Sequence, residues 1–286
     1  MLEHQKVLDI HKVLHTDKLN TGIPYMVMPK VDGWYAYIDY VNGKWSSIQN
    51  EKRVIHSMAW YDRVIKDFFP KLPVGNVRLI GELYIPEAPF RVTNGILNRK
   101  REQAEQVVFA CHDMVSLDPG TELSTLPNHG RHRLLTSQFK HDIWNFWTIP
   151  TLEITPDISR WEYWADKIPD LNHDGIVIKS AYAKYIPGKR NITMMKWKRE
   201  ITLDAWITDV FKTEGKKGNP MWNFSFAGVE DEHKFGGTVA VPKHEDWAKI
   251  ESGQVNLGDT IEIKVMKILE NGSLREPRFC KFRNDR

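Results

Sequence analysis

The sequence contains only two cysteines, Cys111 and Cys280, among its 286 residues. Two cysteines cannot supply the disulfide framework of a small secreted domain or a cysteine-rich zinc cluster. Charged residues are scattered through the N-terminus, which lacks the apolar segment of a signal peptide. No apolar run approaches the roughly 20 residues of a membrane-spanning helix. These absences predict a protein of the reducing cytoplasm, with no targeting signal and no membrane partner.

The sequence also lacks an excess of charge of one sign. It has 40 basic and 37 acidic residues and a net charge of +3, which is too small to indicate a nucleic-acid partner by charge alone. Any contact with nucleic acid must therefore come from local basic patches. Internal repeats and low-complexity segments are absent as well. A hydrophobic content of 41% supports a packed core, and the length suggests one large or two modest domains.

Residues 29–34, with the sequence PKVDGW, join two predicted strands. An apolar run precedes them, and an alternating run over residues 34–40 follows. Lys30 is therefore predicted to lie in a turn, where Gly33 lets the backbone come close to a ligand. A lysine amine becomes a nucleophile where burial and nearby cations lower its pKa, and Asp32 could orient it. The alternative is a surface lysine in an ordinary β-turn.

Acidic residues in two other predicted strands are further candidates. Glu82 lies within the strand predicted over residues 77–85, and an unpaired carboxylate in a buried strand is costly. Glu82 is therefore either on an exposed strand face or a ligand for a ribose or a metal. Asp174 begins another predicted strand, over residues 174–180.

Two lysines in the strand predicted over residues 193–199 suggest an anion site. Lys196 and Lys198 lie on the same side of this strand, separated by Trp197. Like charges on one face repel each other unless an anion lies between them, and phosphate is the natural anion. The alternative is a pair of solvated lysines.

A basic segment, residues 86–106, contains further cations. It is either a solvated loop and helix or a phosphate-binding segment, which would make the affinity depend on salt. Its basic residues are Arg91, Arg99, Lys100 and Arg101.

Apolar periodicity predicts helices over residues 2–15, 51–69, 133–144 and 157–167. Residues 107–115 are predicted to form a strand, and the Pro-, Gly- and Thr-rich residues 117–132 a long loop. Asn42-Gly43 predicts the turn of a β-hairpin.

The pattern changes near residues 199–202, which we take as a domain boundary. Short strands are predicted over residues 203–212, 222–229, 237–242 and 260–268, with a helix over residues 244–250 and a last strand after Asn271-Gly272. Several short strands with one short helix in such a length predict a small barrel of the OB-fold type.

Six short motifs occur in order along nearly the whole chain. They are KVDG at residues 30–33, RLIGELY at 78–84, VFACHD at 108–113, DGIVIK at 174–179, MKWK at 195–198 and REPRFCKFRNDR at 275–286. In this order and spacing they resemble the ATP-dependent DNA ligases, a branch of the covalent nucleotidyltransferases. The resemblance implies an α+β fold. An N-terminal nucleotidyltransferase (adenylation) domain, ATP-grasp-like with antiparallel sheets and helices, is expected over residues 1–200, and an all-β OB-fold domain over residues 201–286.

The resemblance also implies an activity. Members of the family seal nicks between a 3′-hydroxyl and a 5′-phosphate in duplex DNA, using ATP and Mg²⁺ (or Mn²⁺). The reaction passes through a lysyl-AMP intermediate and an adenylated DNA 5′-end. With no room for extra DNA-binding modules, the chain resembles the small ligases of phages and viruses. The expected partner is nicked duplex DNA, and the expected state is a monomer with no evident protein partner.

The resemblance assigns roles by motif position. Lys30 matches the nucleophile, and Asp32 matches the aspartate that supports it. Glu82 matches the carboxylate near the ribose, Asp174 matches the metal-site carboxylate, and Phe109 matches the ring that stacks on adenine. Glu82 and Asp174 are the residues expected to hold the metal. The expected nucleotide-binding residues are Met28, Lys30, Glu82, Phe109, Lys196 and Lys198. The residues expected to orient pyrophosphate are Arg283, Asp285 and Arg286, and those expected to bind DNA are Arg53, Arg91, Arg99, Lys100 and Arg101.

Three positions depart from the family pattern. Tyr35 and Ile48 stand where the family has arginines that touch the ribose and the nick phosphate. Asp174 stands where DNA ligases usually have glutamate. The residues expected to substitute for the missing arginines are Gln49, Lys52 or Arg53.

Other functions share parts of this pattern. An mRNA capping guanylyltransferase has the same lysine and an OB-fold, but the REPRF stretch at residues 275–279 favours the ligase. An RNA ligase is a second alternative, against which the C-terminal motif argues. The alternative outside the enzymes is a nucleic-acid-binding protein with a degenerate catalytic domain.

Overall fold

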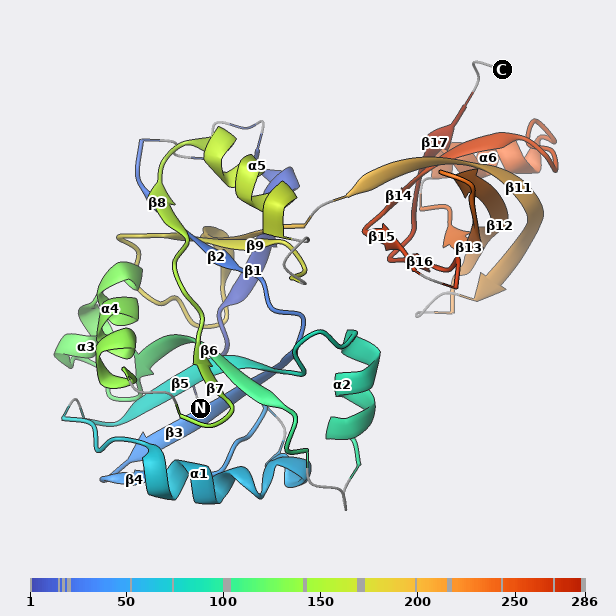
Figure 1. Ribbon diagram of the computed structural model, residues 1–286. Coiled ribbons are helices and arrows are strands. Elements are labelled where there is room, and N and C mark those ends of the chain that lie inside the picture. The colour runs from blue at the N-terminus through green and yellow to red at the C-terminus, as the bar shows by residue number, and fades with distance from the viewer. Residues whose placement is uncertain are drawn as a thin grey trace. The chain divides into compact units, whose positions relative to one another are not determined.

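The computed structural model divides the chain into two compact units, residues 1–198 and 199–286, which are described separately (Figure 1). The structure describes residues 2–14, 16, 19, 22–51, 53–73, 75–99, 104–140, 143–168, 173–198, 200–214, 218–242, 244–269 and 271–283. Among the helices in these ranges, none has the length and apolar character needed to span a lipid bilayer.

The first unit contains two five-stranded sheets. Sheet A has the order β1 (Lys6–Asp9), β10 (Arg190–Trp197), β9 (Ile176–Ser180), β2 (Tyr25–Pro29) and β8 (Glu153–Thr155). Sheet B has the order β4 (Lys44–Trp45), β3 (Trp34–Val41), β5 (Val77–Tyr84), β6 (Val108–Ser116) and β7 (Phe146–Thr148). The expectation of antiparallel sheets is correct for most pairs and wrong at two edges, because β1 pairs with β10, and β7 with β6, in parallel.

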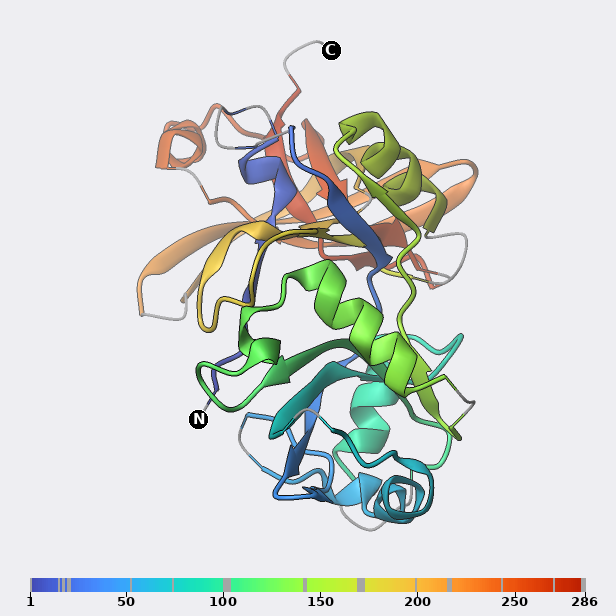
Figure 2. The ribbon, with the colours of Figure 1, turned by 90° about the vertical axis from the view of Figure 1, so that its left-hand side faces the viewer.

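Helices cover one face of each sheet, and the other faces meet. On sheet A, α5 (Ile158–Lys167) and the 3₁₀ turn Ile10–Lys12 bury an apolar cluster. On sheet B the covering helices are α1 (Tyr61–Phe68), α2 (Phe90–Leu97), α3 (Glu122–Thr125) and α4 (Asn128–Gln138). In Figure 2, α4 (green) lies beside β6. A smaller apolar cluster joins the facing sides, with Met26 and Met28 from β2 and Ala110 from β6.

The N-terminal segment corrects one helix prediction. Residues 2–15 were expected to form an amphipathic helix, but residues 6–9 form β1, and a 3₁₀ turn follows. A single helix of this length is marginal without packing. Hydrogen bonding to the edge of β10 satisfies the same backbone groups within a sheet.

Other helix predictions differ at their ends. The helix expected over residues 51–69 is α-helical only over Tyr61–Phe68, because Ile55 donates its backbone N–H to Ile48 and a 3₁₀ turn, His56–Met58, follows. The loop expected over residues 117–132 contains α3 and the start of α4, which ends at Gln138 rather than at residue 144. The helix over residues 157–167 is confirmed by α5.

The predicted hairpin turn is confirmed. Asn42 and Gly43 join β3 to β4 with φ angles of 51° and 78°. Positive φ at both central residues is the signature of a type I′ turn, whose twist matches that of the strands. The local sequence therefore determines this turn.

The second unit contains one five-stranded antiparallel sheet, sheet C. Its order is β13 (His233–Ala240), β12 (Pro220–Glu230), β11 (Ile201–Glu214), β14 (Thr260–Val265) and β17 (Arg278–Phe282). The helix α6 (His244–Glu251) precedes β14, and a short ribbon, β15 (Lys267–Ile268) with β16 (Leu274–Arg275), precedes β17. The predicted strands and helix of this unit are present, although the last long strand begins only at Arg278.

A close backbone contact brings the loop after β2 to the start of β9. The backbone N–H of Lys30 donates to Gly175 O at 2.8 Å, and Asp174 N–H donates to Lys30 O at 2.9 Å. Gly175 has a φ of +111°, and a Cβ at this position would lie 2.2 Å from the Trp197 carbonyl oxygen. Only glycine fits this backbone without strain.

Gly175→Ala is therefore expected to lower the free energy of unfolding by about 2–4 kcal/mol. The matched control is Gly95→Ala in α2, where a Cβ meets nothing within 4 Å, so it should be neutral or slightly stabilising. Urea unfolding followed by circular dichroism measures both. Equal stability of the two variants would show that the close approach at Gly175 does not exist.

Candidate active site

Lys30 lies in a short loop between β2 and β3, where its amine meets a buried carboxylate. Its Nζ donates to Asp174 Oδ2 at 2.8 Å. The Asp174 side chain is 1% exposed, whereas that of Lys30 is 21% exposed. The lysine therefore reaches solvent while its partner stays buried, as a residue that must meet an incoming ligand requires.

A second lysine shares the same carboxylate oxygen. Lys198 Nζ lies 3.1 Å from Asp174 Oδ2. The pairing of Trp197 with Ile176 places the residue after β10 beside the residues before β9. One carboxylate between two ammonium groups leaves a net positive charge, which favours an anion at this position.

Lys196 lies on the same strand face, two residues before Lys198. It pairs with Val177 and is half-buried, whereas Trp197 between the two lysines packs into the core of sheet A. The predicted placement of both lysines on one side of the strand is thus present. Met28 lies nearby, pairs with Val177 from the other side, and is buried between the sheets.

Glu82 belongs to the same site from sheet B. Its neighbour Leu83 packs into the core of sheet B, and its strand partner Ala110 lies in the apolar cluster between the sheets. The Glu82 side chain therefore points towards sheet A. The residue is half-buried, yet its Oε2 atom is buried and has no hydrogen-bond partner among the described residues.

The charge state of Glu82 follows from this position. The pKa of Glu82 is raised to about 8, mainly by burial, with Lys30 opposing the shift and Asp32 adding to it. Asp32 and Lys30 are therefore both close enough to Glu82 to influence its charge. The structure thus brings together five of the predicted site residues, namely Lys30, Asp32, Glu82, Asp174 and Lys198.

The prediction that Phe109 stacks on a nucleotide base is wrong. Its ring is completely buried and packs in the core of sheet B, 5.9 Å from the ring of Phe146. Phe109 shares this face of β6 with Cys111 and Met114. A ring enclosed by core side chains has no free face for a base.

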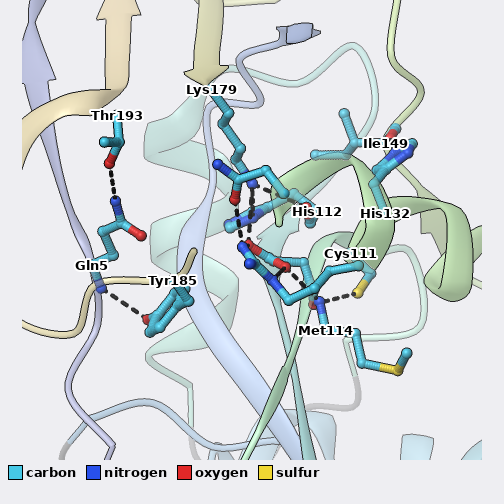
Figure 3. Close-up of polar contacts among 12 residues, drawn as sticks. Gln5, Cys111, His112, Met114, His132, Ile149, Lys179, Tyr185 and Thr193 are labelled. Carbon is cyan, nitrogen blue, oxygen red and sulfur yellow. Dashed lines mark hydrogen bonds and ion pairs between the residues drawn. The ribbon is translucent and has the colours of Figure 1, made fainter. Parts of the chain in front are cut away.

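His112 is the aromatic residue that the sequence analysis missed. The register of β5 and β6 shifts at this point, because Ile80 pairs with Asp113 and Gly81 with Cys111. His112 falls in the resulting bulge, and its ring Nδ1 lies 3.2 Å from Lys179 Nζ on β9 (Figure 3). The ring therefore lies between the sheets. No sequence signal marks a bulge of this kind.

Buried charges surround Lys179. It donates to the His112 carbonyl oxygen at 3.1 Å and lies 3.7 Å from Asp113 Oδ2. Arg131 of α4 forms two hydrogen bonds of 2.9 Å with the Asp113 carboxylate. Burial raises the pKa of Asp113, but the charges of Arg131 and Lys179 outweigh it and hold this pKa below its usual value. Burial and Lys179 lower the pKa of His112, so its imidazole is neutral.

Two of the predicted DNA-binding residues come together although they are 46 positions apart in the sequence. Arg53 and Arg99 are both exposed and line one small crevice together with His56 and Asn98. Arg91 is exposed on α2 and does not line this crevice. Lys100 and Arg101, like Lys52, lie outside the described residues.

The C-terminal candidates belong to the second unit. Arg283 follows β17 and forms ion pairs with Asp204 at 3.0 Å and with Glu262 at 3.1 Å. Lys281 of β17 also lies within 3.5 Å of Glu262. Asp285 and Arg286 lie outside the described residues.

The positions of the two missing arginines have different environments. Tyr35 is half-buried opposite Glu82, and its ring lies 4.1 Å from that of His4. Ile48 is buried in the core of sheet B. Gln49, one of the expected substitutes, contacts the Tyr37 hydroxyl at 3.4 Å, so it is already engaged within sheet B.

Within the described part of the chain, no group of three or more His, Cys, Asp or Glu side chains is arranged to hold a metal ion. Glu82 and Asp174 are the acidic residues of the site whose carboxylates face the space around Lys30. Hard cations such as Mg²⁺ use one or two carboxylates and complete their shell with water and substrate oxygens. Glu82 and Asp174 could therefore bind such an ion only if water and substrate oxygens supply the remaining ligands.

The chain belongs to the ATP dependent DNA ligase domain family, whose sequence model matches residues 26–198. This range contains every site residue of the first unit described above. The matched segment begins within β2, which precedes Lys30, and ends at Lys198, which follows β10.

Particular relatives are more distant. A DNA ligase of Halobacterium salinarum is 24% identical over 212 residues, which cover 66% of this chain and 37% of the relative. The chain thus spans little more than a third of the length of that relative.

Solved structures share the fold. One titled Pmar-Lig_Pre has a TM-score of 0.76 and 17% identity, covering all of this chain and 68% of that one. A structure from a study of DNA binding by Lig E DNA ligases has a TM-score of 0.71 and 17% identity, covering 99% and 100%. The ATP-dependent DNA ligase of bacteriophage T7, in complex with ATP, has a TM-score of 0.53 and 16% identity, covering 97% and 98%.

The raised pKa of Glu82 predicts how stability depends on pH. The unfolded chain releases this proton from about pH 4.5, whereas the folded protein keeps it until about pH 8, so folding becomes less favourable as the pH rises between these values. Glu82→Gln removes this dependence. The variant should match the wild type at pH 5 and melt at least about 2 °C higher at pH 8. Thermal unfolding at both pH values measures the difference, and a variant that is less stable at pH 8 would contradict a protonated Glu82.

Proposed function

We propose that this protein is an ATP-dependent DNA ligase that seals nicks between a 3′-hydroxyl and a 5′-phosphate in duplex DNA. The observation that carries the proposal is the arrangement of Lys30 and Lys198 on one buried oxygen of Asp174. It combines a partly exposed amine, a fixed acceptor and a second cation for a phosphate. Nucleotidyl transfer needs a nucleophile in line and neutralisation of phosphate charge.

In the first step, Lys30 Nζ attacks the α-phosphate of ATP. A nitrogen–phosphorus bond forms, and the bond to the bridging oxygen of pyrophosphate breaks, with its electron pair leaving on pyrophosphate. The amine releases its protons as the bond forms, and Asp174 Oδ2 at 2.8 Å is positioned to accept one. Lys198 and Lys196 offer positive charge to the α-phosphate.

The lysyl-AMP adduct is then consumed in two further transfers. The nick 5′-phosphate displaces Lys30 and takes the AMP, and Lys30 recovers a proton. The nick 3′-hydroxyl then attacks that phosphate and releases AMP, which leaves a phosphodiester bond. Each transfer exchanges one phosphorus bond for another, so ATP supplies all the free energy required.

Glu82 and Asp174 are the residues that would hold Mg²⁺ or Mn²⁺. The buried Oε2 of Glu82 without a partner supports this assignment, because a buried carboxylate oxygen needs a cation or a donor. A bound divalent ion supplies charge neutralisation at the phosphates. Without an ion, a protonated Glu82 can instead donate a hydrogen bond to a ribose hydroxyl.

We infer that the adenine lies between the sheets beside Ala110 and His112, and not against Phe109. Ala110 provides a small side chain in an apolar cluster that includes Met28. His112 provides a neutral ring held by Lys179. This assignment replaces the role first expected for Phe109 and keeps the base on the same face of sheet B as Glu82.

The second unit is proposed to be an OB-fold domain that contacts duplex DNA and carries the pyrophosphate-orienting residues. Its five-stranded antiparallel sheet and single helix before β14 support this assignment. Arg283 is paired with Asp204 and Glu262. It must exchange these partners for pyrophosphate. The Asp204 side chain is 40% exposed, and exposed pairs of this kind contribute only about 0.2–1 kcal/mol.

Arg53 and Arg99 are proposed to bind DNA phosphates near the nick. Both guanidinium groups are exposed and line one crevice, so two positive charges lie close together there. Arg91 extends this surface along α2, and Lys100 and Arg101 follow directly in the sequence. The protein is proposed to act as a monomer in the cytoplasm, where free cysteines such as Cys111 and Cys280 remain reduced.

Lys30→Ala is expected to abolish the covalent AMP adduct and all sealing that starts from ATP. Lys184→Ala, at another exposed lysine, is the matched control and should behave as wild type. Intact mass spectrometry after incubation with ATP, and separately with GTP, measures the adduct. An adduct on Lys30→Ala would remove Lys30 from the mechanism.

The nucleotide arm of this experiment separates the alternatives. A GTP adduct would favour a capping guanylyltransferase. The absence of any adduct on the wild-type protein would favour a binding protein with a degenerate site. Joining of nicked RNA in preference to nicked DNA by the adenylated wild type would indicate an RNA ligase.

Arg283→Ala should separate the steps of the reaction, because pyrophosphate is present only when Lys30 attacks ATP. Sealing of a plain nick with ATP should fall about tenfold or more. Sealing of a nick that is already adenylated, without ATP, should stay close to wild type. Equal losses on both substrates would assign Arg283 to DNA binding or folding instead.

A further inference from the structure

A groove of about 470 Å³ lies where the β3–β4 hairpin meets α1, which are neighbours in Figure 1. It is within the volume range of ligand-binding pockets. None of the candidate site residues lines it. The lining residues are Tyr40, Gly43, Lys44, Trp45, Ser46, Ser47, Asp62, Ile65, Lys66, Phe69 and Lys71.

The floor of the groove is apolar and rigid. Tyr40, Ile65 and Phe69 are each less than a tenth exposed. Trp45 lies against them, with ring centroids 4.7 Å from Tyr40 and 5.2 Å from Phe69. Its indole N–H donates to Pro70 O at 3.0 Å, which fixes the ring. The floor therefore exists before any ligand binds.

The rim of the groove is basic. Lys44, Lys66 and Lys71 are exposed, and none of them forms an ion pair with another residue that the structure describes. Asp62, the acidic residue of the lining, accepts a hydrogen bond of 2.9 Å from Ser47 Oγ. Three lysines around one hollow favour a polyanionic occupant.

The groove is remote from Lys30. Strand β3 begins at Trp34, close to the active-site loop, and ends at Val41, about 25 Å further on. Tyr40 packs in the core of sheet B, on the face turned away from sheet A. An occupant of the groove would therefore leave the active site open.

We propose that this groove docks an acidic peptide segment of a partner protein. An apolar side chain of the peptide lies against the half-buried ring of Trp45 at the edge of the floor, and its carboxylates pair with Lys44, Lys66 and Lys71. Nucleic acid is the other polyanion, but a duplex has no apolar side chain for the floor, and a single strand binds by stacking successive bases on several exposed rings. The rings of Tyr40 and Phe69 are buried and only Trp45 among the lining aromatic rings is half-buried, which suits one apolar side chain, so the chemistry favours a peptide.

The experiment uses the full chain and a fluorescein-labelled peptide in which aspartates flank a central Leu-Phe pair. Fluorescence anisotropy measures the Kd for wild type, for Lys66→Glu combined with Lys71→Glu, and for Lys44→Glu. The control is Lys167→Glu on α5, which covers the other sheet. The two groove variants should each weaken binding at least about tenfold, and the control less than about twofold.

Two further peptides test the two halves of the proposal. Replacing the aspartates with serine, or the Leu-Phe pair with two serines, should each weaken binding at least about tenfold. The substituted lysines are all exposed, namely Lys44, Lys66, Lys71 and Lys167. The variants are therefore expected to fold, and thermal unfolding checks this.

Three results would overturn the proposal. They are no saturable binding of the peptide to wild type, equal binding by the groove variants and the control, and displacement of the peptide by a mixed-sequence single-stranded oligonucleotide of higher affinity. The last result would identify the groove as a nucleic-acid site.

Discussion

The carboxylate of Asp174 is the interaction on which the active site depends. One of its oxygens receives both Lys30 and Lys198, so a single buried charge fixes two cations from different parts of the chain. Both cations compensate the burial of this charge. The position of Asp174 in turn requires the backbone contact between Lys30 and Gly175. The ends of β2 and β9, the backbone of Gly175 and the charges of Asp174 and its two lysines therefore depend on one another.

Sheets A and B are held together by buried charged side chains as well as by apolar packing. Asp113, Arg131 and Lys179 form a compensated group beside a small apolar cluster. Removing Asp113 would leave two buried cations without their counter-charge, which is strongly destabilising. The helix α4 contributes Arg131 and also bonds through Asn128 to the end of β9 at Ser180. These contacts tie sheet A to sheet B and to α4 at this end.

The two positions that lack the arginines of the family pattern have different surroundings in this structure. Tyr35 keeps a side chain on the face of sheet B that carries Glu82, in contact with the N-terminal His4. Ile48 has become a core residue. Position 35 therefore keeps a half-buried polar side chain opposite Glu82, whereas position 48 has an apolar side chain buried in the core.

The sequence alone determined what depends on neighbouring residues: the lysine turn after an apolar strand, the type I′ hairpin at Asn42-Gly43, helix α5 and the strands of the second unit. The tertiary structure decided which face of a strand is buried and which distant segments meet. Both faces of β6 carry large side chains, so no periodicity could show that Phe109 enters the core while a bulge turns His112 towards Lys179. Likewise, residues 6–9 became a strand because the edge of β10 was available to pair with them. The physical reason is that burial and strand pairing depend on the whole packed chain. Turns and amphipathic patterns depend only on residues that are close together in the sequence.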